Sequence, residues 1–156
     1  MADPLGHLEG RTALVTGGGT GIGAAIARTF ADAGARVTIA GRRPEPLADV
    51  AGAHDAITAA PPDGTDEAAV TTLFADRGPF DIVVANAGAV ASAPATRTSL
   101  DQWRQLLDVN LTGTFLTLRE ALRQPATGSG RLLAVASTAG LVGYPYVAAY
   151  CAAKHG

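Results

Sequence analysis

The chain has 156 residues, of which 47% are hydrophobic and 17% charged, a composition typical of a folded domain rather than a disordered segment. Its net charge of −2, without any basic run, argues against nucleic acid or an anionic membrane as a partner. The single cysteine excludes an internal disulfide, and neither a signal-peptide pattern nor an apolar run of membrane-spanning length is visible, so we expect a cytoplasmic protein.

Short apolar runs alternate with longer helix-like stretches, the pattern of a parallel sheet covered by helices on both faces. The chain therefore predicts an α/β fold with a doubly wound parallel sheet of about five strands. Strands are predicted over residues 12–16, 36–40, 56–59, 82–85 and 132–136. Helices are predicted over residues 22–33, 45–51, 67–75 and 99–122, with a last one opening near Val147.

The long helix predicted from Ser99 has a readable start and an apolar face. Ser99 followed by Gln102 suits a capping box, in which side chains satisfy free backbone donors. Asn110 falls on the apolar face, and because a buried amide without partners costs about 1–3 kcal/mol, it should be hydrogen-bonded. The stripe predicted to be buried consists of Trp103, Leu107, Leu111, Thr114, Phe115, Leu118 and Leu122.

A glycine-rich loop follows the first predicted strand and leads straight into a helix. Glycines let the backbone approach a pyrophosphate closely, and the helix N-terminus offers free N–H groups to that anion. No Lys-Ser or Lys-Thr pair follows the glycines, which argues against a nucleoside-triphosphate loop; a simple strand-to-helix turn is the alternative. The candidate dinucleotide-binding residues here are Gly17, Gly19, Thr20, Gly21, Ile22 and Gly23.

The ends of the second and third predicted strands bear on which nicotinamide cofactor is bound. NAD sites usually carry an acid about 20 residues beyond the glycines, whereas this chain has Gly41-Arg42-Arg43. A guanidinium can bind the 2′-phosphate of NADP, so Arg42 favours NADP(H), with NAD(H) as the alternative. In the competing interpretation, both arginines are solvated loop charges. Asp63 could accept a hydrogen bond from the adenine amino group, or it could begin a helix.

Tyr150 and Lys154 lie four residues apart, so on a helix they share one face. A phenol, which ordinarily titrates near ~10, is a poor acid–base group at neutral pH, but a neighbouring ammonium favours the phenolate. Ser137, at the end of the fifth predicted strand, could donate to a substrate oxygen. The three together predict proton transfer to or from an alcohol.

These motifs occur in the order and spacing of the short-chain dehydrogenase/reductase family, which the chain resembles from about Gly10 to Gly156. The resemblance implies a Rossmann-like sheet that binds NAD(H) or NADP(H). The residues that carry it are Thr16 to Gly23, Asn86-Ala87-Gly88, Asp108-Val109-Asn110, Ser137 and Tyr150-x-x-x-Lys154.

The resemblance also implies roles for the catalytic residues. Tyr150 would be the general acid/base, and Lys154 would favour its phenolate and bind the nicotinamide ribose. Ser137 would orient the carbonyl or alcohol, and Asn110 would hold a water that links Lys154 to a proton relay. No metal is implied.

Asn86 and Gly88 would shape the sheet beside the cofactor. Where the family usually has two asparagines and often Asp-Val, this chain has Ala85-Asn86 and Asp63-Gly64. We expect residues 1–156 to form one NAD(P)-binding domain whose C-terminal part is missing, including the family's last two strands, its substrate lid and part of its association surface. The complete parent would be a homo-oligomer.

Three functions fit this pattern. The first is an NADP(H)-dependent carbonyl reductase or alcohol dehydrogenase acting on a small molecule, with 3-oxoacyl thioester (acyl-carrier-protein) reductases as the nearest relatives. The second is an NAD-dependent secondary-alcohol dehydrogenase. The third is a dinucleotide-binding fragment without catalytic activity.

Overall fold

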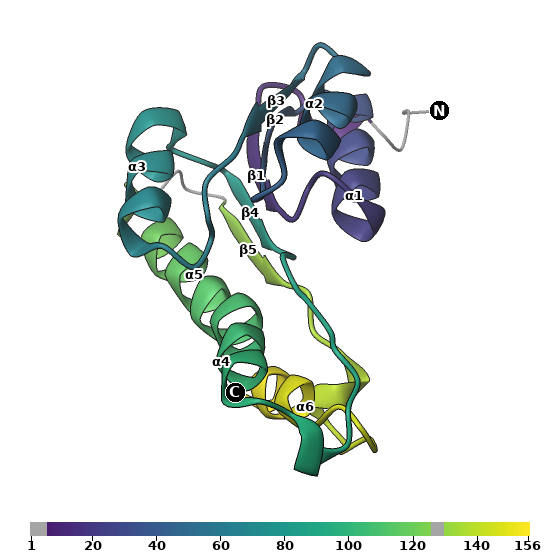
Figure 1. Cartoon of the computed structure of the whole chain (residues 1–156). Coiled ribbons are helices and arrows are strands. Elements are labelled where there is room, and N and C mark those ends of the chain that lie inside the picture. Colours follow the sequence, from purple (N-terminus) through teal and green to yellow (C-terminus); the bar gives the residue numbers. More distant parts are fainter. Residues whose placement is uncertain (1–5, 126–129) are drawn as a thin grey trace.

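The computed structural model describes residues 6–125 and 130–156, which form an α/β fold around a five-stranded parallel sheet (Figure 1). The strand order is β3-β2-β1-β4-β5, so the chain reverses direction across the sheet between β1 and β4. This is the predicted doubly wound arrangement. The strands are β1 (Thr12–Thr16), β2 (Arg36–Ala40), β3 (Ile57–Ala60), β4 (Ile82–Ala85) and β5 (Arg131–Ala134).

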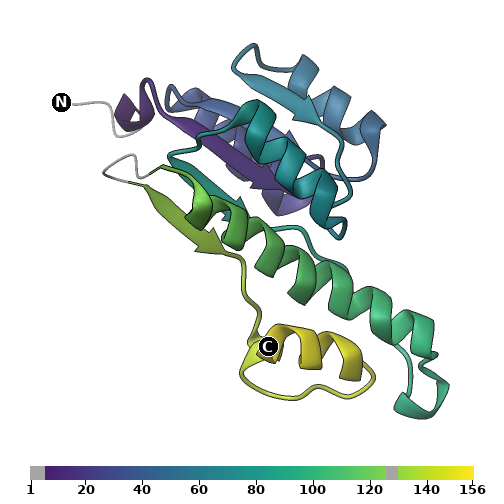
Figure 2. The same cartoon turned by 90° about the vertical axis from the view of Figure 1, so that its left-hand side faces the viewer.

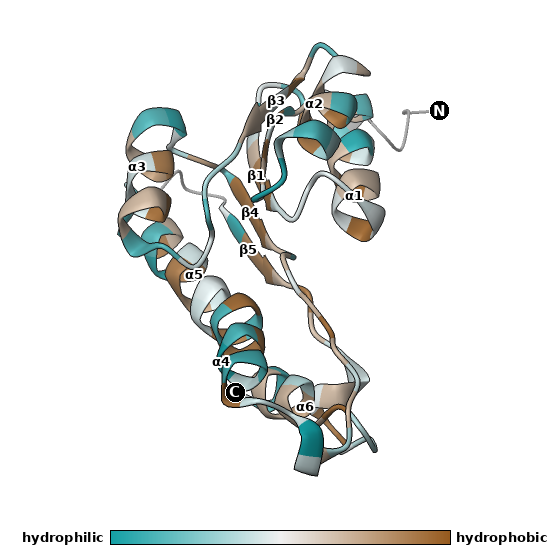
Figure 3. Cartoon of the chain, in the orientation of Figure 1, coloured by the Kyte–Doolittle hydropathy of each residue, from teal (hydrophilic) through white to brown (hydrophobic). Residues whose placement is uncertain are grey.

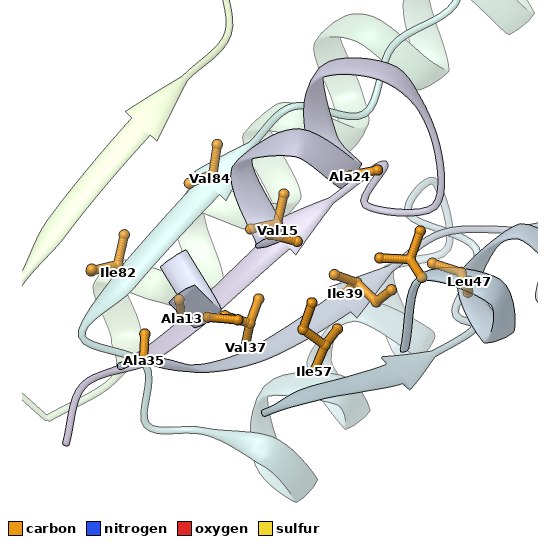
Figure 4. Packing of buried hydrophobic residues seen from close by; sticks show 13 residues of the cluster. Ala13, Val15, Ala24, Ala35, Val37, Ile39, Leu47, Ile57, Ile82 and Val84 are labelled. Carbon is orange, nitrogen blue, oxygen red and sulfur yellow. The ribbon is translucent and has the colours of Figure 1, made fainter. Parts of the chain in front are cut away.

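Helices cover both faces of this sheet, because alternate residues of each strand point to opposite sides. On one side, Ala13 and Val15 of β1 pack with residues of α1 (Gly21–Asp32) and α2 (Pro44–Gly52), as Figure 4 shows for part of this cluster. On the other side, Leu14 belongs to a second cluster with residues of α3 (Glu67–Arg77) and α5 (Gly113–Arg123). Figure 3 shows the apolar character of the strands between these helices.

The predicted strands agree closely with the observed ones. Strands β1, β2 and β4 have the predicted bounds, and β3 lies one residue later than predicted. Strand β5 ends at Ala134 instead of residue 136. Its neighbour β4 ends at Ala85, whose carbonyl accepts the last ladder bond from Val135 N at 3.0 Å, so Ala136 has no strand beside it.

The long helix predicted over residues 99–122 is interrupted. It consists of α4 (Leu100–Leu107), the π-helical turn η3 (Asp108–Thr112) and α5, which together run past the edge of the sheet (Figure 2). Ser99 caps α4 as predicted, since its Oγ accepts from Gln102 N at 3.1 Å. The last helix, α6 (Ala148–His155), begins next to Val147 as predicted and packs against α4.

The prediction of the buried stripe on this helix was wrong at Phe115 and Leu122, whereas its other five members are half-buried. Phe115 and Leu122 have 56% and 74% of their surface exposed, whereas Leu116 is 5% exposed and Thr117 is also buried. A π-helical turn holds more residues than an α-helical turn, so it changes which face the following residues present. The expectation for Asn110 is confirmed, because that residue is 4% exposed and hydrogen-bonded.

Three short 3₁₀ turns complete the described part of the fold: η1 (Gly6–Leu8), η2 (Ala95–Arg97) and η4 (Thr138–Gly140). Across residues 6–125 and 130–156, no helix has the length and apolarity needed to span a membrane. The same residues contain no cluster of three or more side chains that could hold a metal ion.

Candidate functional site

The carboxyl ends of the strands open into a cleft of about 710 Å³. It lies where the strand order reverses, the place at which open α/β sheets bind ligands. Every candidate residue predicted from the sequence lines this cleft. They are Gly17, Gly19, Thr20, Gly21, Ile22, Gly23, Arg42, Asp63, Asn86, Gly88, Asn110, Ser137, Tyr150 and Lys154.

Two glycines of the loop after β1, Gly17 and Gly23, are packed too tightly to be replaced by larger residues. Gly17 has a φ of +68°, and a Cβ atom there would lie 2.9 Å from both Ala87 Cα and Asn86 Nδ2. A Cβ on Gly23 would collide with the carbonyl oxygen of Gly17. The loop therefore leads into α1 as bare backbone, and this cradle fits the close approach of a pyrophosphate.

Asn86 holds the same loop from the neighbouring strand. Its Nδ2 donates to Thr16 O at 2.9 Å, and its backbone N–H donates to Thr16 Oγ1 at 3.0 Å. The Thr16 hydroxyl also accepts from Ala87 N at 3.1 Å. Thr16 thus joins the ends of β1 and β4, a role that the sequence analysis did not assign to it.

Asn110 makes three hydrogen bonds through its side chain. Its Nδ2 donates to Ala89 O at 2.8 Å and to Leu106 O at 2.9 Å, while Oδ1 accepts from Ala89 N at 3.2 Å. A Cβ on Gly88 would lie 3.0 Å from Oδ1, so the chain after β4 passes directly over this amide. Because both N–H groups already bind backbone carbonyls, any water held by Asn110 must be bound elsewhere, at Oδ1 or the main-chain carbonyl.

Asp63 and Arg42 line the part of the cleft beyond β2 and β3. Asp63 does not begin α3, because Asp66 is the N-cap and accepts from Ala68 N and Ala69 N. Instead, Oδ1 of Asp63 accepts from the backbone N–H of Thr65 at 3.0 Å and from its hydroxyl at 2.8 Å.

The environment of this carboxylate favours its charged form. The backbone hydrogen bond from Thr65 lowers the pKa of Asp63, and burial opposes it; the Thr65 hydroxyl and the positive charge of Arg42 lower the pKa further. The sequence analysis missed Thr65, although an Asp followed two residues later by a hydroxyl residue is a recognisable turn pattern.

The other end of the cleft contains the predicted proton-transfer residues. Tyr150 and Lys154 both lie on α6, with Lys154 Nζ 5.9 Å from the centre of the Tyr150 ring. Lys154 Nζ donates to Val135 O at 3.0 Å, which ties the ammonium to the end of β5. Ser137 caps η4 by accepting from Ala139 N at 3.1 Å, so its own hydroxyl proton remains available to a substrate oxygen.

Cys151, next to Tyr150, is a packing residue. It is 8% exposed, and its Sγ accepts from the backbone N–H of Tyr144 at 3.3 Å. This contact holds the loop before α6 against the helix.

Comparison with known proteins gave a family and several relatives. Residues 11–156 match the family model described as short chain dehydrogenase. The NADP-dependent (R)-specific alcohol dehydrogenase of Lentilactobacillus kefiri is 40% identical over 157 residues, which cover 95% of this chain and 62% of that protein. The D-threitol dehydrogenase of Mycolicibacterium smegmatis is 37% identical over 159 residues, with 96% and 61% covered. The chain thus spans less than two thirds of the length of either relative.

Two solved structures are similar in fold and in sequence. One, from Beutenbergia cavernae, is provisionally assigned as an NAD(P) dependent gluconate 5-dehydrogenase and contains NADP at low occupancy. Its TM-score is 0.85 at 39% identity, covering 98% of this chain and 64% of that one. The other is the apo form of LigO from Sphingobium sp. strain SYK-6, with a TM-score of 0.88 at 29% identity, covering 95% and 59%.

Proposed function

Because the chain belongs to the short chain dehydrogenase family, we propose that it is the cofactor-binding and proton-transfer part of an NADP(H)-dependent oxidoreductase that interconverts a secondary alcohol and a carbonyl compound. The observation that carries this proposal is that one cleft contains both parts of the site. This cleft has a bare glycine cradle on one side and Tyr150, Lys154 and Ser137 on the other.

The glycine loop and Arg42 would hold the cofactor. Backbone N–H groups at the start of α1 would bind the pyrophosphate, and the Arg42 guanidinium would bind the 2′-phosphate of NADP. When bound, NADP(H) supplies or takes up the hydride. Two similar proteins support this choice of cofactor, since one is named as NADP-dependent and the other contains NADP.

The chain's own residues would handle the proton and the oxygen of the substrate. The Ser137 hydroxyl would donate to the substrate oxygen, and the Tyr150 hydroxyl would give its proton to that oxygen during reduction and regain one during oxidation. Lys154 uses one N–H to bind Val135 O, which leaves two for the phenol oxygen and the cofactor ribose.

A narrower assignment to 3-oxoacyl thioesters has no support beyond the sequence pattern, because three of the similar proteins carry the names of an alcohol, a D-threitol and a gluconate dehydrogenase. We therefore propose the broader class of secondary alcohols and ketones. NAD(H) is the alternative cofactor, and equal affinity for the two would contradict the role given to Arg42.

The chemistry can be tested by replacing Tyr150→Phe in the protein that carries this chain. The variant keeps the aromatic ring but has no proton to transfer, so turnover of ketones with NADPH should disappear while NADPH binding persists. Tyr144→Phe removes a hydroxyl from a half-exposed ring in the preceding loop and is the matched control. Turnover by Tyr150→Phe at the rate of the unsubstituted protein would refute the proton-transfer assignment.

A further inference from the structure

We infer that Asp63 is a specificity-determining residue: its charge weakens the binding of a 2′-phosphate by Arg42 and so limits the preference for NADP over NAD. This inference rests on the proposed NADP(H) function. Neither residue needs to touch the other for this effect, because a fixed negative charge repels a phosphate dianion over several ångströms.

The sheet brings the two charges to one side of the cleft. Strands β2 and β3 run parallel with Ala40 opposite Ala60, and neighbouring strands lie about 4.8 Å apart. Arg42 follows Ala40 by two residues and Asp63 follows Ala60 by three, and both line the cleft. The register thus brings Arg42 and Asp63 to the same side of the cleft, after neighbouring strands.

The Asp63 carboxylate is fixed in place. Both Thr65 donors bind its Oδ1, and the peptide carbonyl of Gly64 lies 3.1 Å from where a Cβ on Gly113 would be, so this turn rests on the start of α5. Oδ2 has no donor among the residues that the structure describes. The negative charge thus cannot easily turn away from an arriving phosphate.

Arg42 interacts electrostatically with the Asp63 carboxylate but forms no ion pair with it. The attraction of Arg42 contributes to the lowered pKa of Asp63, although no carboxylate of the described residues lies within ion-pair distance of the Arg42 guanidinium. An arginine without an ion-pair partner can bind a phosphate, but the negative charge of Asp63 offsets part of the attraction between them. Removing the acid should strengthen the 2′-phosphate contact.

Two nucleotide probes isolate the effect of the Asp63 charge on binding of the 2′-phosphate. The unsubstituted chain and Asp63→Asn are titrated calorimetrically with 2′,5′-ADP and with 5′-AMP, which lacks only the 2′-phosphate, and the ratio of the two dissociation constants is compared. Any role of Asp63 in binding adenine affects both probes and cancels in the ratio. Asp63→Asn should raise the preference for 2′,5′-ADP about three- to tenfold at low salt, and the gain should shrink at high salt.

Asp55→Asn is the matched control. Asp55 is exposed and precedes β3, so this variant makes the same charge change at the opposite end of the strand and should leave the ratio unchanged. An unchanged or lowered ratio in Asp63→Asn overturns the inference while leaving the proposed function intact. An unsubstituted chain that binds neither probe contradicts the proposed function and this inference together. A rise of equal size in Asp55→Asn would mean that net charge alone is responsible, and it also overturns the inference.

Discussion

The amide side chain of Asn110 and the backbone of Ala89 are joined by hydrogen bonds in both directions, one of 2.8 Å to the carbonyl and one of 3.2 Å from the N–H. A third bond of 2.9 Å reaches Leu106 O. These bonds connect the π-helical turn η3 to the chain segment that follows β4. One buried side chain therefore fixes the long helix against that segment, which lines the cleft.

Replacing Asn110→Ala should destabilise the fold. The change leaves two carbonyls and one N–H without their partner, and each unsatisfied buried group costs about 1–3 kcal/mol. We expect a total loss of about 3 kcal/mol or more in the free energy of unfolding, measured with denaturant. Asn110→Asp keeps an acceptor for Ala89 N but places a carboxylate against two carbonyls, and should be at least as damaging. A fully stable Asn110→Asp variant would show that these bonds contribute little.

Gly23→Ala should disrupt the glycine cradle. The added methyl group would meet the Gly17 carbonyl and would lie 2.5 Å from Asn86 Nδ2, so α1 must move away from the loop. NADPH affinity should fall at least tenfold, and stability by about 1–3 kcal/mol. Gly52→Ala is the control, because it also adds a methyl group within a helix but has nothing within 4 Å. It should be neutral or stabilising by about 0.4–1 kcal/mol.

Arg42→Asp should reverse the cofactor preference. The variant replaces a cation that can bind a phosphate through two hydrogen bonds with an acid that repels it and can accept from a ribose hydroxyl. NADPH affinity should fall about ten- to a hundredfold, whereas NADH affinity should stay level or rise. The dissociation constants can be measured by the quenching of tryptophan fluorescence or by calorimetry. Arg36→Asp makes the same charge change at the start of β2 and should leave both affinities alone.

The strands of the sheet could be predicted from the sequence because a strand buried on both faces is a continuous apolar run. Such runs differ clearly from the periodic pattern of the helices. For the same reason β1, β2 and β4 were placed to the residue, and β3, with its two prolines following, was displaced by one. The cleft residues could also be predicted, since the carboxyl ends of parallel strands must meet at one side of the sheet.

The interruption of the long helix could not be predicted from local pattern. The π-helical turn η3 is stabilised by the bonds between Asn110 and Ala89, which is 21 residues away in the chain. An amphipathic pattern read at a constant 3.6 residues per turn places Phe115 and Leu122 in the interior, and the wider turn carries them to the surface instead. The hydrogen bonds from Thr65 to the Asp63 carboxylate were missed for a similar reason. They form within a turn, which helical and strand periodicities do not describe.

Lys154→Met should impair both binding and chemistry, in contrast to Tyr150→Phe. The Lys154 ammonium donates to Val135 O at 3.0 Å and lies in the cleft beside the Tyr150 ring. Its loss therefore removes a cation from both the cofactor ribose and the phenol. NADPH affinity should fall about tenfold, and turnover should be lost. Normal NADPH affinity in Lys154→Met would restrict the role of the lysine to the proton-transfer step.

The chain of 156 residues should self-associate through apolar side chains that its own fold leaves uncovered. Phe115 and Leu122 are 56% and 74% exposed on α5, and Leu132 and Leu133 are 43% and 45% exposed on β5, which is an edge strand of the described sheet. An unpaired strand edge and an apolar helix face both favour contact with further chains. Sedimentation velocity should therefore detect dimers or larger species at micromolar concentration.

Two variants can identify which surface is responsible. The double variant Phe115→Lys and Leu122→Lys places charges on the helix face alone, and Leu133→Lys places one on the exposed face of the edge strand β5 alone. If the helix face dominates, the first should give monomers and the second should remain associated, because burying an unpaired ammonium is costly. Unfolding curves that match the unsubstituted chain are required of both, since these side chains are exposed and contribute little to its core. A monodisperse monomer of the unsubstituted chain would contradict the prediction, and it would mean that apolar groups on α5 and β5 can remain in water without driving association.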